Sequence, residues 1–127
     1  MQLLVLLRFG SFMQTRDLQP RPELRLKLAT NVYRIPDVCV FLGEPEQLVP
    51  DVPPLVVIEI LSKDDRYSDV IQKLDEYRVW GVPNIWLIDP TTKHLAVHTD
   101  LGPQNVSSLA LPKYSFQLTP AELFDNL

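Results

Sequence analysis

Hydrophobic residues follow two different patterns along the chain, and each predicts a different kind of strand. Residues 23–29 alternate between apolar and charged side chains, which is typical of a strand with one face in solvent. Residues 55–61 form an almost continuous apolar run, broken only by Glu59, and such runs belong to central strands buried on both faces. Further strands are predicted over 34–42, 84–88 and 93–99, and an edge strand over 107–111.

Helical periodicity is clearest between residues 67 and 80, and this helix is predicted to end at Gly81 because glycine readily takes the left-handed conformation after a helix. Its apolar face holds Val70, Ile71, Leu74 and Tyr77. A helix over 3–12 lacks a capping residue and is marginal on its own. One or two helical turns are predicted over 119–124, where proline follows threonine.

The order of these elements predicts a single α/β (α+β) domain over residues 1–127, with a mixed sheet and flanking helices. The strand–helix–strand unit across 55–88 requires a parallel pair joined by a right-handed crossover. Residues 23–42 and 84–99 are expected to form antiparallel hairpins. A length of 127 residues with 46% apolar side chains is sufficient for one such core.

Composition limits where the protein works. Cys39 is the single cysteine, so a disulfide scaffold is excluded and a reducing cytoplasm is expected. No apolar run approaches the ~20 residues of a membrane span, and no signal peptide is predicted at the start.

Charge is unevenly distributed, although the formal net charge is -4. Basic side chains predominate over residues 1–34, so an exposed patch there can meet phosphates; scattered solvated charges are the alternative. The candidate contacts to DNA are Arg21, Arg25, Lys27 and Arg34.

Glu59 is the residue that does not fit its surroundings. A carboxylate inside a buried strand must be paired, protonated or bound to a cation, since unpaired burial is strongly unfavourable. Asp37, in an apolar stretch after Pro36, has a milder form of the same problem. If the two strands are neighbours, both carboxylates converge and can bind Mg²⁺ (or Mn²⁺), which prefers hard oxygen ligands.

The helix that follows supplies a lysine. Asp69, Lys73 and Tyr77 lie four residues apart and therefore form one stripe along its side. Lys73 falls at the shoulder between the buried and the wet face, from where its ammonium can reach the end of the central strand. Two carboxylates and a lysine around a metal form an arrangement suited to phosphodiester cleavage, with Asp37, Glu59 and Lys73 as the catalytic residues.

Each of these residues also has a purely structural interpretation. Asp37 can shape a turn or the entry of a strand. Glu59 can form a buried ion pair with Arg34 or Lys73 without any metal. Lys73 can be a surface lysine paired with Asp69.

Other chemistry is disfavoured. His94 and His98 are about 13 Å apart along a strand at ~3.3 Å per residue, too far to share a metal. Cys39 lies in an apolar strand, where a structural thiol is expected. There is neither a glycine-rich phosphate loop nor a nucleophile elbow around Ser62.

Four ordered motifs resemble the Uma-type restriction endonuclease family of the PD-(D/E)xK nuclease superfamily: residues 34–38, 53–62, 69–77 and 81–90. The resemblance implies a restriction-endonuclease-like fold, dependence on Mg²⁺ and hydrolysis of DNA. Carried over by position, Asp37 and Glu59 are metal ligands and Lys73 is the catalytic lysine. Family members lack a lysine two places after the glutamate, where this chain has Leu61, and the helix lysine is taken to replace it.

The chain departs from the family pattern at two places. Members usually have several dozen more residues before the first strand, so residues 1–13 are expected to be the end of that region, and exposed apolar surface there would favour a homodimer. The loop at 63–66 reads Lys-Asp-Asp-Arg, where many relatives have a Ser-Pro-Ser-type turn. This loop is expected to tune the site without abolishing it. The shorter N-terminal region, together with the basic patch over 16–34, motivates the alternative function: a catalytically inactive nuclease-like domain that binds DNA or a protein partner.

Overall fold

The computed structural model describes residues 1–10 and 17–125. The helices are α1 (Gln2–Gly10), α2 (Tyr67–Trp80) and α3 (Pro120–Phe124), with a short 3-10 helix at Pro112–Tyr114. The strands are β1 (Leu18–Pro22), β2 (Leu26–Ala29), β3 (Val32–Arg34), β4 (Val38–Leu42), β5 (Val56–Ile60), β6 (Asn84–Asp89), β7 (His94–Thr99), β8 (Gly102–Val106), β9 (Leu109–Leu111) and β10 (Phe116–Leu118). None of the described helices is both long and apolar enough for a membrane span.

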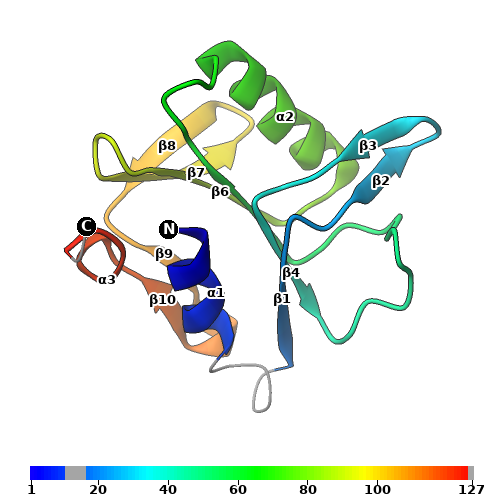
Figure 1. Cartoon of the computed structure of the whole chain (residues 1–127), viewed down its shortest axis with the longest axis horizontal. Coiled ribbons are helices and arrows are strands. Elements are labelled where there is room, and N and C mark those ends of the chain that lie inside the picture. Colours follow the sequence, from blue (N-terminus) through cyan, green and yellow to red (C-terminus); the bar gives the residue numbers. More distant parts are fainter. Residues whose placement is uncertain (11–16, 126–127) are drawn as a thin grey trace.

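A mixed sheet forms the centre of the molecule (Figure 1), with its strands in the order β1-β4-β5-β6-β7-β8. β5 and β6 are parallel and are connected through α2, whereas the other neighbouring strands are antiparallel. The expected mixed sheet, the parallel pair across 55–88 and the hairpin across 84–99 are thus confirmed. The pairs β2–β3 and β9–β10 form separate two-stranded sheets.

The two faces of the sheet are covered by different elements (Figure 1). α2 packs on one face, while α1, α3 and the β9–β10 pair pack on the other. The alternation along β5 follows from the strand period of two: Val56 and Ile58 belong to the core beneath α1, and Val57 belongs to the core beneath α2. Glu59 therefore lies on the α2 face.

α2 has the bounds that the sequence predicts. Val70, Leu74 and Tyr77 are buried against the sheet. Gly81 has a φ of 111°, and its N–H donates to the carbonyls of Tyr77 and Arg78, which ends the helix in the expected left-handed cap.

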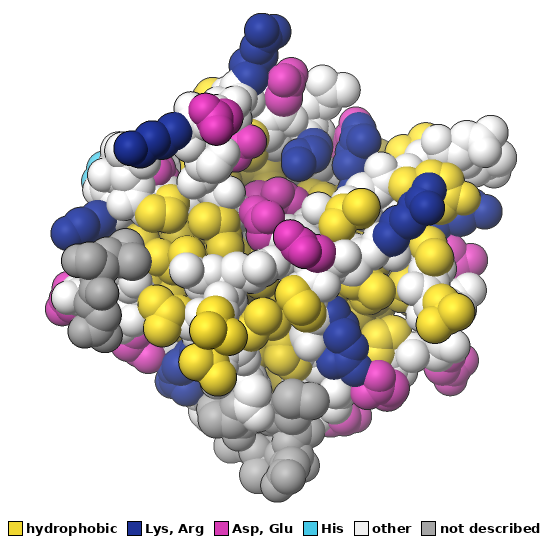
Figure 2. Space-filling model, viewed as in Figure 1, with side chains coloured by type: hydrophobic (Ala, Val, Ile, Leu, Met, Phe, Trp, Pro, Cys, Tyr) yellow, Lys and Arg dark blue, Asp and Glu magenta, His cyan; other side chains and the backbone are white. Residues whose placement is uncertain are grey.

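The aromatic packing beneath the sheet explains how the short α1 is stabilised. Phe9 is fully buried, and its ring stacks on Phe116 with centroids 3.9 Å apart and on Trp86 at 6.2 Å. An isolated helix of this length is unstable in water, so tertiary packing maintains it. The opposite side of α1 leaves Leu3 and Leu7 exposed, and Figure 2 shows apolar side chains gathered over this helix.

The prediction of one strand over 34–42 is wrong. The segment is divided between β3, which pairs with β2, and β4, which joins the main sheet between β1 and β5. Pro36 lies between them, and because proline has no N–H it interrupts the ladder of hydrogen bonds. The division separates the β2–β3 hairpin from the sheet but keeps Asp37 next to β4.

Two other edges of the structure differ from expectation. β1 contains Pro20 and Pro22 and was not predicted; prolines are tolerated there because β1 is an edge strand, whose outer N–H groups need no partner. The strand expected at 107–111 is β9, but it pairs with β10, and β8 forms the edge of the main sheet. Residues 11 and 12 of the helix expected over 3–12 lie outside the described part of the chain.

We expect Phe9→Ala to lower the free energy of unfolding by about 3–5 kcal/mol, because it removes a buried aromatic ring and leaves a cavity beside Phe116 and Trp86. Urea denaturation followed by tryptophan fluorescence measures this. Leu3→Ala, on the exposed side of the same helix, is the matched control and should change stability by less than about 0.5 kcal/mol. Equal effects of the two substitutions would contradict the packing of α1.

Candidate active site

The register between β4 and β5 brings the two predicted acids together. Val38 pairs with Ile58, so extending the antiparallel ladder by one residue places Asp37 opposite Glu59. Both carboxylates lie on the α2 face, because Cys39 and Val57, two residues away on each strand, belong to the core beneath α2. The sequence-predicted convergence of the two side chains is therefore what the fold produces.

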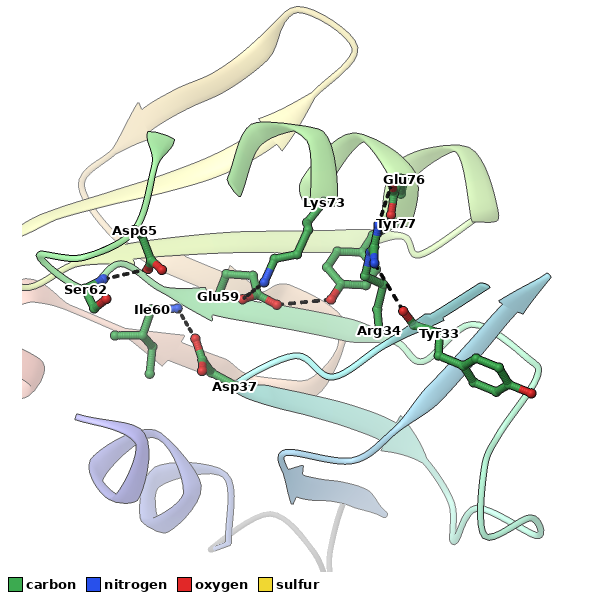
Figure 3. A network of polar contacts seen from close by, with 10 residues as sticks. All are labelled: Tyr33, Arg34, Asp37, Glu59, Ile60, Ser62, Asp65, Lys73, Glu76 and Tyr77. Atoms are coloured by element: carbon green, nitrogen blue, oxygen red, sulfur yellow. Dashed lines mark hydrogen bonds and ion pairs between the residues drawn. The ribbon is translucent and has the colours of Figure 1, made fainter. Parts of the chain in front are cut away.

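Glu59 is buried, with 5% of its surface exposed, and two side chains of α2 contact its carboxylate (Figure 3). The Tyr77 hydroxyl donates a hydrogen bond to Oε1 at 3.1 Å, and Lys73 Nζ lies 3.7 Å from Oε2, an ion pair longer than a hydrogen bond. Burial raises the pKa of Glu59 to about 7, an effect that the Lys73 charge opposes and the Asp37 charge reinforces. Burial also raises the pKa of Tyr77, so its hydroxyl stays a donor.

Asp37 is held from the opposite side of the site. Its Oδ2 accepts the backbone N–H of Ile60 at 2.7 Å (Figure 3). Burial raises the pKa of Asp37, whereas the Ile60 N–H and the Lys73 charge lower it. The Asp37 carbonyl accepts from Gln2 Nε2 at 2.7 Å, so α1 is fastened to the start of β4.

A polar cavity of about 180 Å³ opens over these groups. Its lining comprises Ile35, Asp37, Glu59, Ile60, Ser62, Asp65, Val70 and Lys73. The described residues contain no group of three or more His, Cys, Asp or Glu side chains suited to a metal. Two converging carboxylates nevertheless fit Mg²⁺, because this ion usually keeps several waters and takes only one or two carboxylates from the protein.

The other site predictions have mixed outcomes. Arg34 does not pair with Glu59; its Nε and Nη2 donate to Glu76 of α2 at 2.6 and 2.8 Å, which fastens the β2–β3 hairpin to the helix. Lys73 pairs with Glu59 and not with Asp69, which is exposed in the first turn of α2. The stripe Asp69–Lys73–Tyr77 thus contributes its last two members to the site.

Asp65 also lines the cavity, a position that no sequence pattern predicts. Its Oδ2 accepts the N–H of Ser62 at 2.9 Å, and its own N–H donates to the Ser62 carbonyl, so the two residues close a tight turn after β5. The unusual Lys-Asp-Asp-Arg loop was the only signal for it.

The four basic residues predicted to contact DNA are not equally available. Arg21 is paired with Glu44, and Arg34 is engaged by Glu76. Arg25 lies over the ring of Tyr33, 4.1 Å from its centroid, and Lys27 is directly opposite Tyr33 in the β2–β3 ladder. Arg25 and Lys27 therefore share the outer side of the hairpin with an aromatic ring.

The cysteine and the histidines, which the sequence disfavours as catalytic or metal-binding groups, lie outside the cavity. Cys39 is fully buried, and burial raises the pKa of its thiol to about 12, so it is unsuited to nucleophilic chemistry. His98 Nε2 lies 3.1 Å from Asp75 Oδ1, whereas His94 is exposed at the other end of β7.

A wider groove, of about 590 Å³, runs between the β2–β3 hairpin and α2, and neither Asp37 nor Glu59 lines it. Four of its seven lining residues are apolar. Its two acids, Asp75 and Glu76, are already paired with cationic or imidazole side chains. The smaller polar cavity is therefore the better site for chemistry.

Comparison with known proteins agrees with this assignment of the fold. The sequence model of the Uma2 family, described as "Putative restriction endonuclease", matches residues 1–121. The chain belongs to the Uma2 family. The family resemblance expected from the four motifs is thus confirmed.

A solved structure shows how the Uma2 chain compares in three dimensions. It is described as that of a putative nuclease belonging to DUF820 from Anabaena variabilis ATCC 29413, and it superimposes with a TM-score of 0.84. The match covers 98% of this chain and 78% of that chain at 21% sequence identity, which shows a shared fold. No curated protein matches the chain.

The buried glutamate gives the metal-free Uma2 protein a specific dependence on pH. Since the pKa of Glu59 is about 7 when folded and about 4.5 when unfolded, ionising it destabilises the fold as pH rises between these values. We expect Glu59→Gln to gain roughly 2–3 kcal/mol of stability over wild type between pH 5 and pH 8, from ~1.4 kcal/mol per pKa unit. Urea denaturation in EDTA at both pH values measures the difference.

Glu46→Gln, which removes an exposed glutamate in the loop after β4, controls for the loss of one charge. A Glu59→Gln advantage that is the same at both pH values would show that this carboxylate is not buried as described.

Proposed function

We propose that this Uma2-family chain is a metal-dependent endonuclease that hydrolyses phosphodiester bonds of DNA. The observation that supports this function is the pairing of Asp37 and Glu59 across β4 and β5, beside Lys73. In this proposal Asp37 and Glu59 hold Mg²⁺ or Mn²⁺, and Lys73 is the catalytic lysine. The family and the fold support the nuclease class, and the site chemistry supports the metal.

The proposed reaction combines a bound metal with two contributions from the chain's own residues. A bound Mg²⁺ would polarise the phosphate and lower the pKa of the attacking water. Lys73 carries a positive charge at the cavity and neutralises negative charge that develops on the phosphate. The hydrogen bonds from Tyr77 and Ile60 hold the two carboxylates in place, so little reorganisation is needed when substrate binds.

Contact with the DNA backbone is assigned to the β2–β3 hairpin. Figure 2 shows basic side chains over this hairpin, and Arg25 and Lys27 make no ion pair with a described acidic residue. The hairpin leads directly into Asp37 through Pro36, so a strand held by it lies near the proposed site. Arg21 and Arg34 are left with structural roles by their ion pairs.

The second candidate function is a nuclease-like domain that binds DNA or a protein partner without cutting. It is favoured by the ion pair between Lys73 and Glu59, because this contact partly compensates the buried acid without any bound cation. Metal-independent, salt-sensitive DNA binding together with intact plasmid would support this alternative.

A nicking assay on supercoiled plasmid tests the proposed activity. We expect cleavage by wild type with Mg²⁺ or Mn²⁺ and none with EDTA. Asp37→Asn and Glu59→Gln remove metal-binding charge, and Lys73→Met removes the cation, so each should reduce the rate by about 100-fold or more.

Lys113→Met is the matched control for the lysine substitution, since Lys113 lies in the 3-10 helix outside the site. Cleavage that persists unchanged in Glu59→Gln would remove this acid from the mechanism.

The role of the hairpin is tested separately by fluorescence anisotropy with a labelled duplex. Replacing Arg25 and Lys27 by glutamine should weaken binding and reduce the slope of log affinity against log salt by up to ~2, about one for each lost phosphate contact. The control replaces Lys93, in the turn between β6 and β7, and Lys113, in the 3-10 helix, and should leave the slope closer to that of wild type. An unchanged slope in the hairpin variant would place the DNA contact elsewhere.

A further inference from the structure

α2 places the hydroxyl of Tyr77 in the buried interior, next to the Glu59 carboxylate. The Tyr77 side chain is fully buried, in the same core cluster as Val57 and Leu74. Its hydroxyl donates to Glu59 Oε1 at 3.1 Å, and this is the only hydrogen bond found for that hydroxyl within residues 1–10 and 17–125. Figure 3 shows the ring oriented toward Glu59 from the side opposite to Asp37.

The two carboxylates are fixed in the same way. Tyr77 occupies one oxygen of Glu59, and the backbone N–H of Ile60 occupies one oxygen of Asp37. Within the described residues, no donor at hydrogen-bond distance engages the second oxygen of either group; Lys73 approaches Glu59 only to 3.7 Å. One oxygen of each acid is thus held by the protein, and the other remains available for a ligand.

Tyr77 is itself firmly held. Its carbonyl accepts the N–H groups of Gly81 and Val82, both at 3.1 Å, in the cap that ends α2. The preceding residue, Glu76, accepts two hydrogen bonds from Arg34 of the β2–β3 hairpin. The hydroxyl therefore projects from a point fixed by the helix end, by the hairpin and by the surrounding core.

Glu59 needs such support more than Asp37 does. A glutamate has three side-chain torsions, so its carboxylate can occupy several positions unless a partner selects one. Groups that orient a metal ligand typically change metal affinity by 10–100-fold when they are removed. A lysine 3.7 Å away gives electrostatic attraction with little directional constraint, whereas the tyrosine hydroxyl gives a directed bond.

We propose that Tyr77 is a positioning residue of the site: its hydroxyl selects the Glu59 rotamer that aims Oε2 into the cavity beside Asp37. This inference rests on the proposed function insofar as the aimed oxygen serves a divalent cation. It differs from a purely structural role, in which the hydroxyl only finds a partner for itself in the core.

The test compares Tyr77→Phe with Tyr67→Phe, which makes the same change at an exposed position on the same helix. The first readout is the rotamer distribution of Glu59 in the metal-free protein, from side-chain scalar couplings measured by NMR. Wild type and Tyr67→Phe should each show one rotamer, and Tyr77→Phe should show averaging over several.

The second readout is the dissociation constant for Mn²⁺ in the absence of DNA, measured by calorimetry. Tyr77→Phe should weaken Mn²⁺ binding by about 10-fold or more, whereas Tyr67→Phe should leave it within about two-fold of wild type. Thermal unfolding of both variants is recorded, because a loss of stability alone does not explain weaker binding to a folded protein.

The outcomes separate this inference from the proposed function. If Glu59 keeps one rotamer in Tyr77→Phe, the positioning role is overturned, whatever the metal data show. If Glu59 is freed but wild type binds no Mn²⁺, the positioning role stands and the metal-dependent function fails. If Tyr77→Phe does not fold, NMR of the Tyr77 hydroxyl proton in the wild-type protein tests the role instead. Slow exchange with solvent together with a nuclear Overhauser effect to Glu59 supports the role. Rapid exchange of this proton with solvent overturns it.

Discussion

The burial of the Glu59 carboxylate in the central strand is the constraint on which the rest of the site depends. An ionised acid in this position is unfavourable unless hydrogen bonds and opposite charge compensate for the lost water. The fold supplies Tyr77 and Lys73 from one helix, while Asp37 adds a second negative charge opposite. The protein alone thus compensates the acid incompletely, which supports the proposed binding of a cation.

Parallel pairing of β5 and β6 is what brings the helix to the acid. The chain must cross from the end of β5 to the start of β6, and α2 makes this connection over one face of the sheet. Lys73 and Tyr77 are one helical turn apart, so both side chains lie over Glu59. The helix therefore serves as connection, core and source of site residues at once.

The two faces of the sheet differ in polarity: one packs against an apolar core, and the other carries the site acids. Beneath the sheet, Phe9, Trp86 and Phe116 stack in an apolar core that stabilises the fold and, within residues 1–10 and 17–125, contains no buried charge. On the α2 face the core is interrupted by Glu59, and polar contacts fasten the hairpin and the helix around it. Stability supplied by the first face lets the second retain an unfavourable acid, which is typical of functional sites.

Elements with local signals were predictable from the sequence: α2 with its glycine cap, the buried strand around Glu59 and the capped α3. The sequence also marked Asp37, Glu59 and Lys73, because a charge in an apolar strand and a lysine at a helix shoulder are visible as anomalies in a pattern. Tertiary structure alone decided that β4 leaves the hairpin at Pro36 and that β1, despite its prolines, closes the sheet edge. The register between β4 and β5 places Asp37 opposite Glu59. Tertiary packing selects Glu76 as the partner of Arg34, and Glu59 as the partner of Tyr77. These pairings join residues 18 to 42 positions apart, so no local pattern specifies them; they follow from how strands and helix meet in space.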